Sequence, residues 1–153
     1  MRPTTAVPSP FEPTTISRRA VLRGSAGAGV EGTLDDLLVL ARELQAPTRL
    51  APETLAEATA VQFPGLGGVL PGFGRQDPND WGLGLELRDA KTPHWTGTRN
   101  SPQTYGHFGR SGTFLWIDPV AGIALGCLTD LAFGDWAAEA WPQLSDAVLA
   151  GFG

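Results

Sequence analysis

The hydrophobic and polar positions of the first half of this sequence predict helices. After Gly32, apolar residues recur every three to four positions, which is typical of an amphipathic helix. Thr33 and Asp36 have the spacing of a capping box at its start, and Pro47 ends it. A second, shorter helix opened by a proline is predicted over residues 52–60.

The second half of the chain carries β-type patterns. Residues 81–88 alternate strictly, with large apolar side chains at the odd positions, which predicts a half-buried strand. The apolar runs 113–117 and 123–128 are joined by a short turn-forming segment, which predicts a hairpin. Residues 63–80 hold five glycines and three prolines, so we expect a long loop there.

A terminal amphipathic helix is expected from Asp135 onward, with a kink or a late start at Pro142. The order is thus helices, three or four antiparallel strands and a C-terminal helix, which predicts an α+β fold with helices flanking an antiparallel sheet. Residues 1–28 are expected to form a loop-rich N-terminal segment, and residues 29–153 the folded domain.

Composition narrows the class of protein. The 153 residues are 42% hydrophobic and 18% charged, as in globular domains, and the net charge of −5 excludes a nucleic-acid partner that needs a basic face. We expect no membrane-spanning segment, since no apolar run approaches the roughly 20 residues required. A single cysteine, Cys127, favours a reducing compartment, hence a cytoplasmic location. The twin-arginine-like sequence at 17–23 lacks a following hydrophobic stretch and is interpreted as a decoy.

Residues 105–130 resemble the third to fifth sheet strands of class C β-lactamase-like esterases and DD-peptidases. The motif His107-Phe108-Gly109 stands where that superfamily of serine hydrolases carries its third conserved motif. The helix after Thr33 resembles the family's S/T-x-x-D-L helix, and the terminal helix fits as well. The resemblance covers most of the chain and implies the C-terminal part of a β-lactamase/transpeptidase-like fold.

The resemblance also implies roles for the residues of this motif. Gly109 would let a substrate lie against the strand, and the backbone N–H of Arg110 would be one oxyanion donor. His107 would face the catalytic lysine and tyrosine and assist the proton relay. Because an unperturbed histidine is mostly neutral at pH 7, a fixed cation for a substrate carboxylate is lacking. That favours small-molecule ester or peptide-like substrates over β-lactams.

Two motifs of the family are absent from this sequence. Ser-x-x-Lys cannot exist because Lys91 is the only lysine and Arg88 stands three residues before it. Tyr-x-Asn is absent because the only tyrosine, Tyr105, has His107 two residues later, at the position of the asparagine. We therefore expect a hydrolase fragment that is inactive alone, with a missing N-terminal half as its implied partner. The alternative is a non-catalytic module of the same fold that binds a peptide or partner chain along a strand edge.

Several other interpretations are open. His107 could be a partly buried strand histidine, and a triad of Ser111, His107 and Asp118 is conceivable. A G-x-G-x-x-G match at 27–32 lacks a preceding strand, and the two histidines and Cys127 have no metal-ligand spacing, so no cofactor or metal is expected. Cys127 is expected to be a buried small hydrophobe, and the five tryptophans are expected to pack in the core or to form an aromatic shelf. Finally, we expect one face of the sheet to lack its cover.

Overall fold

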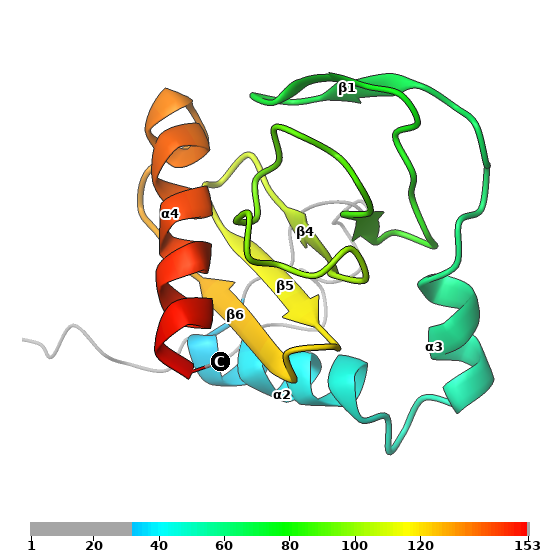
Figure 1. Ribbon diagram of the computed structural model, residues 1–153. Coiled ribbons are helices and arrows are strands. Elements are labelled where there is room, and N and C mark those ends of the chain that lie inside the picture. Colours follow the sequence, from blue (N-terminus) through cyan, green and yellow to red (C-terminus); the bar gives the residue numbers. More distant parts are fainter. Residues whose placement is uncertain (1–31, 153) are drawn as a thin grey trace, which may run out of the picture. The chain divides into compact units, whose positions relative to one another are not determined.

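The computed structural model describes residues 32–152, nearly all of which belong to the second of the chain's two units, Thr33–Gly153. The predicted loop-rich segment 1–28, the arginine pair within it and most of the 27–32 glycine motif lie outside the described residues. The elements are α2 (Leu34–Gln45), α3 (Pro52–Ala58), β1 (Gly68–Leu70), β2 (Gly74–Gln76), β3 (Glu86–Leu87), β4 (Tyr105–Phe108), β5 (Phe114–Asp118), β6 (Ile123–Cys127) and α4 (Asp135–Phe152) (Figure 1). The predicted α+β class with a C-terminal helix is confirmed.

A four-stranded antiparallel sheet in the order β3-β4-β5-β6 forms the centre of this unit. The predicted hairpin is confirmed as β5 and β6. Its turn is fixed by the buried carboxylate of Asp118, which accepts hydrogen bonds from the amides of Val120 (3.1 Å) and Ala121 (3.0 Å). An aspartate that binds backbone amides two and three residues ahead is a common turn device.

Each face of the sheet is covered by a helix of this chain (Figure 1). Phe114 and Trp116 point to the face on which α4 places Trp141, whereas Leu115 and Ile117 point to α2 and its Leu44. The expectation of one uncovered face is therefore wrong for β5, all of which is buried. Side chains of a strand alternate between faces, so a continuous apolar run requires a cover on each.

The helix starts follow the sequence closely. The capping box of α2 is confirmed: Thr33 Oγ1 accepts a hydrogen bond from the Asp36 amide (3.2 Å), and the Asp36 carboxylate accepts one from the Thr33 amide (2.9 Å). α4 begins at Asp135 and runs through Pro142, so a late start is wrong. Gly134 offers its carbonyl to the amides at the helix start, which establishes the first turn before the proline is reached.

The predicted strand over 81–88 is mostly a reversal of the chain. Trp81 and Glu86 form an isolated bridge, the Gly82 amide donates to the Leu85 carbonyl at 2.8 Å, and only Glu86–Leu87 pairs as a strand. Gly84 has φ +75°, a conformation that glycine adopts without penalty. Two glycines inside the alternating pattern thus favour a turn over a continuous strand.

The predicted loop 63–80 contains a short hairpin of β1 and β2. Gly72 (φ +79°) and Gly74 (φ +80°) supply the left-handed conformations that reverse the chain between them. Leu70 and Phe73 enter the α4-side core, so the segment is anchored although most of its residues are exposed.

Gly106 of β4 cannot accept a side chain. A Cβ there would lie 2.1 Å from the Leu115 carbonyl oxygen of β5. We expect Gly106→Ala to push the strands apart and to lower the free energy of unfolding by about 1–3 kcal/mol, as overpacking does. Gly151→Ala, in a helix with open space around it, should leave stability unchanged or slightly raised. Chemical denaturation measures both, and equal losses would contradict the assignment.

Candidate functional site

His107 lies on β4 opposite Leu115 of β5. It has the same parity as Tyr105, whose hydroxyl donates to the Leu44 carbonyl of α2 at 2.6 Å, so its side chain points to the α2 face of the sheet. The side chain is nevertheless exposed, beyond the reach of the helix. The interpretation of His107 as a partly buried strand histidine is therefore wrong, and the imidazole is available to a ligand or a partner.

The edge of β4 next to His107 is open. β3 pairs only with Tyr105 and Gly106, so the pairing ends one residue before His107. The Gly109 amide donates to the Thr113 carbonyl at 2.9 Å, and Arg110 follows in the turn that the Gly112 amide closes onto the Gly109 carbonyl at 3.0 Å. Among residues 32–152 the Arg110 amide has no hydrogen-bond acceptor, so it is free to donate to an oxyanion.

Trp81 stands beside this histidine. The two ring centroids are 5.4 Å apart and the ring planes meet at 68°, an edge-to-face arrangement. The chain on either side of Trp81 is fixed: its carbonyl accepts from the Gln62 amide at 3.0 Å, and a Cβ on the next residue, Gly82, would lie 1.9 Å from the Ala58 carbonyl oxygen. A half-buried indole therefore forms a wall next to the exposed imidazole.

A buried polar network is connected to Trp81 through the backbone. The Glu86 carboxylate, 1% exposed, accepts hydrogen bonds from the Lys91 ammonium, from His94 Nε2 (2.8 Å) and from Trp95 Nε1 (2.9 Å). The ammonium also donates to the Asp80 carbonyl at 2.7 Å, one residue before Trp81. The single lysine of this chain is thus committed to a structural ion pair and is not available as a catalytic base.

His94 is the neutral member of this network. Its Nδ1 accepts from the Thr96 amide (3.1 Å) and lies 2.7 Å from the Thr96 hydroxyl, so Nε2 carries the proton that is donated to Glu86. Burial lowers the pKa of His94, although Glu86 acts in the opposite direction. Burial also acts to raise the pKa of Glu86, but the hydrogen bonds from His94 and Lys91 and the charge of Lys91 hold it below its usual value. The network is a carboxylate–ammonium pair completed by a neutral imidazole.

The conceivable triad of Ser111, His107 and Asp118 is not assembled. The Asp118 carboxylate accepts from the Ser101 amide (2.6 Å) and hydroxyl (2.7 Å) in addition to its own turn. Ser111 Oγ lies 2.9 Å from Thr113 Oγ1 at the other end of β5. Asp118 is therefore a structural residue. Ser111 contacts a second hydroxyl and not a base, so the two residues do not form a nucleophile–base pair with His107.

Cys127 belongs to the periphery of the α4-side core, as expected for a small apolar side chain. Burial raises the pKa of its thiol, which keeps the sulfur protonated and poorly nucleophilic. The prediction for the tryptophans is also confirmed for three of them, since Trp95, Trp116 and Trp141 are at most 1% exposed.

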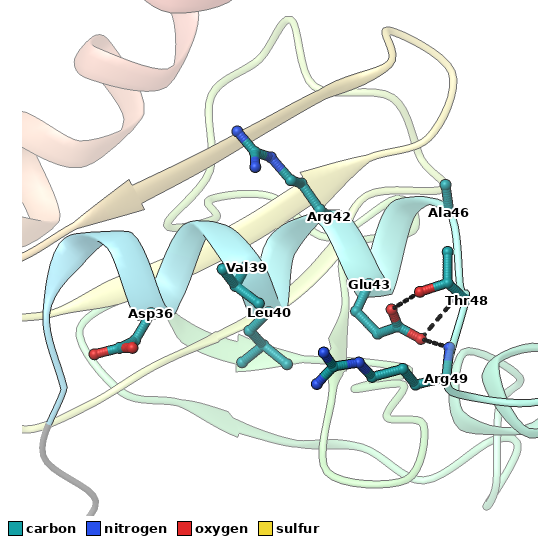
Figure 2. A pocket seen from close by; sticks show the side chains of 8 residues that line it. All are labelled: Asp36, Val39, Leu40, Arg42, Glu43, Ala46, Thr48 and Arg49. Atoms are coloured by element: carbon teal, nitrogen blue, oxygen red, sulfur yellow. Dashed lines mark hydrogen bonds between the residues drawn. The ribbon is translucent and has the colours of Figure 1, made fainter.

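An open groove of about 520 Å³ runs along the outer side of α2 (Figure 2). Val39 and Leu40 form its apolar part, and Arg42, Glu43 and Arg49 its polar part. Every residue that lines the groove belongs to α2 or to the segment that follows it, so the groove is separate from His107. Within the described residues, no helix is long and apolar enough to cross a membrane.

Glu43 closes the end of this groove by capping the segment after α2. Its carboxylate accepts from the amides of Arg49 (2.5 Å) and Thr48 (2.8 Å), as Figure 2 shows. It also accepts from the Leu50 amide at 2.8 Å. These amides lower the pKa of Glu43 to about 2 from 4.5. A carboxylate with a depressed pKa stabilises the fold above its unfolded pKa, and the contribution is lost as the pH falls from 4.5 toward 2.

We therefore expect the thermal unfolding midpoint of the unaltered chain to decrease when the pH is lowered from about 7 to about 3. The decrease should be smaller for Glu43→Gln, which lacks the titrating group. Glu139→Gln, at an exposed position of α4, is the matched control and should fall as the unaltered chain does. Identical acid sensitivity of the Glu43 variant and the unaltered chain would contradict the role of this carboxylate.

Fold and site together define an α+β protein with an antiparallel sheet and a histidine motif on one of its strands. The sequence model of the β-lactamase family matches residues 1–149, nearly the whole chain, and the chain belongs to this family. It is similar to the esterase EstB of Burkholderia gladioli, with 30% identity over 132 residues. It also resembles a crystallised β-lactamase from Mycobacterium bovis, with 57% identity and a TM-score of 0.76.

The chain spans only part of these relatives. The match to EstB covers 82% of this chain and 31% of the esterase, and the match to the M. bovis β-lactamase covers 78% of this chain and 44% of that protein. The prediction of a β-lactamase-related serine hydrolase, of which this chain corresponds to one part, is therefore confirmed at the level of the family.

Proposed function

We propose that this chain supplies the third-motif strand, one oxyanion donor and part of the substrate pocket of a serine hydrolase that cleaves esters or amides through an acyl-enzyme. The observation that carries this proposal is the exposed His107 on an open strand edge, followed by Gly109 and the unbonded Arg110 amide. We propose further that the nucleophile and its base come from a separate N-terminal half, because Lys91 is buried in an ion pair.

The chemistry assigned to this chain is limited. When a serine oxygen adds to the substrate carbonyl, the carbonyl electron pair moves to oxygen, and the Arg110 N–H donates to the oxyanion that forms. His107, from the face of β4, relays the proton that leaves the serine hydroxyl toward the leaving group. Neither residue forms a covalent bond to the substrate. The single, half-buried Cys127 agrees with a reducing, cytoplasmic location, which is part of this proposal.

The second candidate is a non-catalytic module that binds an extended peptide. It is favoured by the same open edge of β4, where unpaired backbone groups could add a strand. The two candidates differ in what a complementing half would do: hydrolysis requires that half, whereas edge binding does not.

Complementation tests the proposal. A fragment of a relative that carries Ser-x-x-Lys and Tyr-x-Asn is coexpressed with this chain, and hydrolysis of p-nitrophenyl acetate is measured. Turnover should appear only in the mixture, and His107→Ala should lower kcat by about 10²–10⁴-fold, the range for a general acid–base group. Cys127→Ala, which removes only a packing contact, is the control.

Equal effects of the two substitutions on kcat, at equal folding, would contradict the role of His107. No turnover from a complex that forms would contradict the proposed hydrolase. Retention of an extended peptide by the chain alone, together with that loss, would establish the edge-binding candidate.

A further inference from the structure

Two observations around His107 are not used by the hydrolase chemistry. One is the edge-to-face contact of Trp81 with its ring, and the other is the buried network of Glu86, Lys91 and His94. They are linked through the backbone, because Lys91 holds the Asp80 carbonyl next to Trp81 while Glu86 pairs with Gly106 next to His107.

We propose that Trp81 and His107 form one wall of the substrate pocket, that the Glu86–Lys91–His94 network positions this wall, and that the wall takes an uncharged, apolar group of the ester or amide. The proposal rests on the proposed function in one respect only, namely that the ligand is a carbonyl substrate. The contact and its dependence on the network are properties of this chain.

The geometry of the network explains how it would fix the positions of Trp81 and His107 without contacting a substrate. Glu86 is connected to both parts of the wall, through its bridge to Trp81 and its pairing with Gly106, the residue before His107. Its two carboxylate oxygens are occupied by three donors, so its position is fixed from within the core. Fully satisfied buried polar networks hold a single geometry, and the two ends of the bridge are therefore held at a fixed separation.

The chemistry of the wall selects the ligand. Trp81 is half-buried and presents an aromatic surface, and Leu83, which is 56% exposed, lies in the same reversal of the chain. The nearby ion pair is sealed in the core and offers no charge to a ligand. An aryl or alkyl group would gain apolar contact on this wall, whereas a carboxylate would lose hydration against the indole surface.

The first test uses NMR spectra of the purified chain, which has only two histidines. The His107 ring protons should show a ring-current shift that Trp81→Leu strongly reduces and Trp81→Phe partly keeps, while the more distant Phe108 ring is retained in both variants. Glu86→Gln, which keeps the shape of the side chain, should reduce the shift as well. Trp136→Leu, which removes an indole in edge-to-face contact with Trp141 in α4, is the matched control and should leave His107 in place.

The second test is a titration of the same sample with N-benzylacetamide, an uncharged aryl amide, and with N-acetylglycine, its carboxylate counterpart. The first should shift the Trp81 and His107 signals and the second should not, and Trp81→Leu should weaken binding by about two- to tenfold, the range for an aromatic contact. A His107 signal unaffected by Trp81→Leu, or equal shifts with both compounds, overturns the inference. Failure of esterase complementation alone overturns the proposed function and leaves this result standing.

Discussion

Purified alone, the chain is expected to give no acylation burst and no turnover of activated esters or of a chromogenic cephalosporin. A serine hydroxyl is a weak nucleophile unless a base removes its proton, and the only lysine is bound to Glu86 in the core. Removal of the nucleophile or base of a serine hydrolase lowers kcat on the order of 10⁶-fold. The Arg110 amide and His107 stabilise a transition state that this chain cannot begin to form.

A fluorophosphonate probe makes this expectation sharp, because it labels activated serines irrespective of the substrate. No stoichiometric label should be found on the chain, and Ser111, which is exposed next to the His107 strand, is the residue to inspect. Ser111→Ala should therefore leave the result unchanged. Stoichiometric labelling of a serine in the unaltered chain would show that a nucleophile–base pair exists and would overturn the proposed division of the enzyme.

Local sequence signals predicted the elements whose cause is local. Three elements are determined by a few neighbouring residues each: the capping box at Thr33, the hairpin around Asp118 and the apolar run of β5. These elements need no information from distant residues. The strand position of the motif at His107 is implied by the resemblance instead, and β4 confirms it.

The parts that were missed depend on contacts across the chain. Glu86 stands at an even position of an alternating pattern and would face solvent in a regular strand, yet it is buried because Lys91 and His94 fold back onto it. No local sequence pattern predicts such pairing, because a charged side chain is buried only where a partner compensates its charge. The wall formed by Trp81 was missed because a reversal at Gly82 brings the indole to His107, where a strand would have carried it away.

The cover of the sheet was misjudged for a related reason. The apolar positions of α2 continue around the helix, with Leu37, Ala41 and Leu44 against the sheet and Val39 and Leu40 exposed. Periodicity shows that a helix is apolar, but it does not say which of its sides meets which surface. The structure assigns one side to β5 and β6, and leaves the other along the groove of Figure 2.

The largest effect on stability is expected from Lys91→Met. Lys91 and Glu86 are 5% and 1% exposed, so removal of the ammonium leaves a carboxylate inside the core with only His94 and Trp95 as donors. Breaking a buried pair by removing one partner typically lowers the free energy of unfolding by about 3–5 kcal/mol. Chemical denaturation of the purified chain measures the loss.

The exposed pair Arg75–Asp77 provides the matched control. Its charged atoms are 3.8 Å apart and both side chains are more than two-thirds exposed, so Arg75→Met should lower the unfolding free energy by less than about 1 kcal/mol. Similar losses for the two methionine variants would show that Lys91 is not part of a buried charge network.

The double variant Glu86→Gln/Lys91→Met separates the cost of an unpaired charge from the worth of the pair. With both charges removed, a neutral amide at position 86 can still accept from His94 and Trp95, and nothing charged is left without a partner in the core. We therefore expect the double variant to be more stable than Lys91→Met alone, with a coupling free energy of roughly 0.5–3 kcal/mol in the cycle. Additive effects of the two substitutions on the unfolding free energy would show that Glu86 and Lys91 do not act as a unit. That result would also contradict their joint positioning of Trp81.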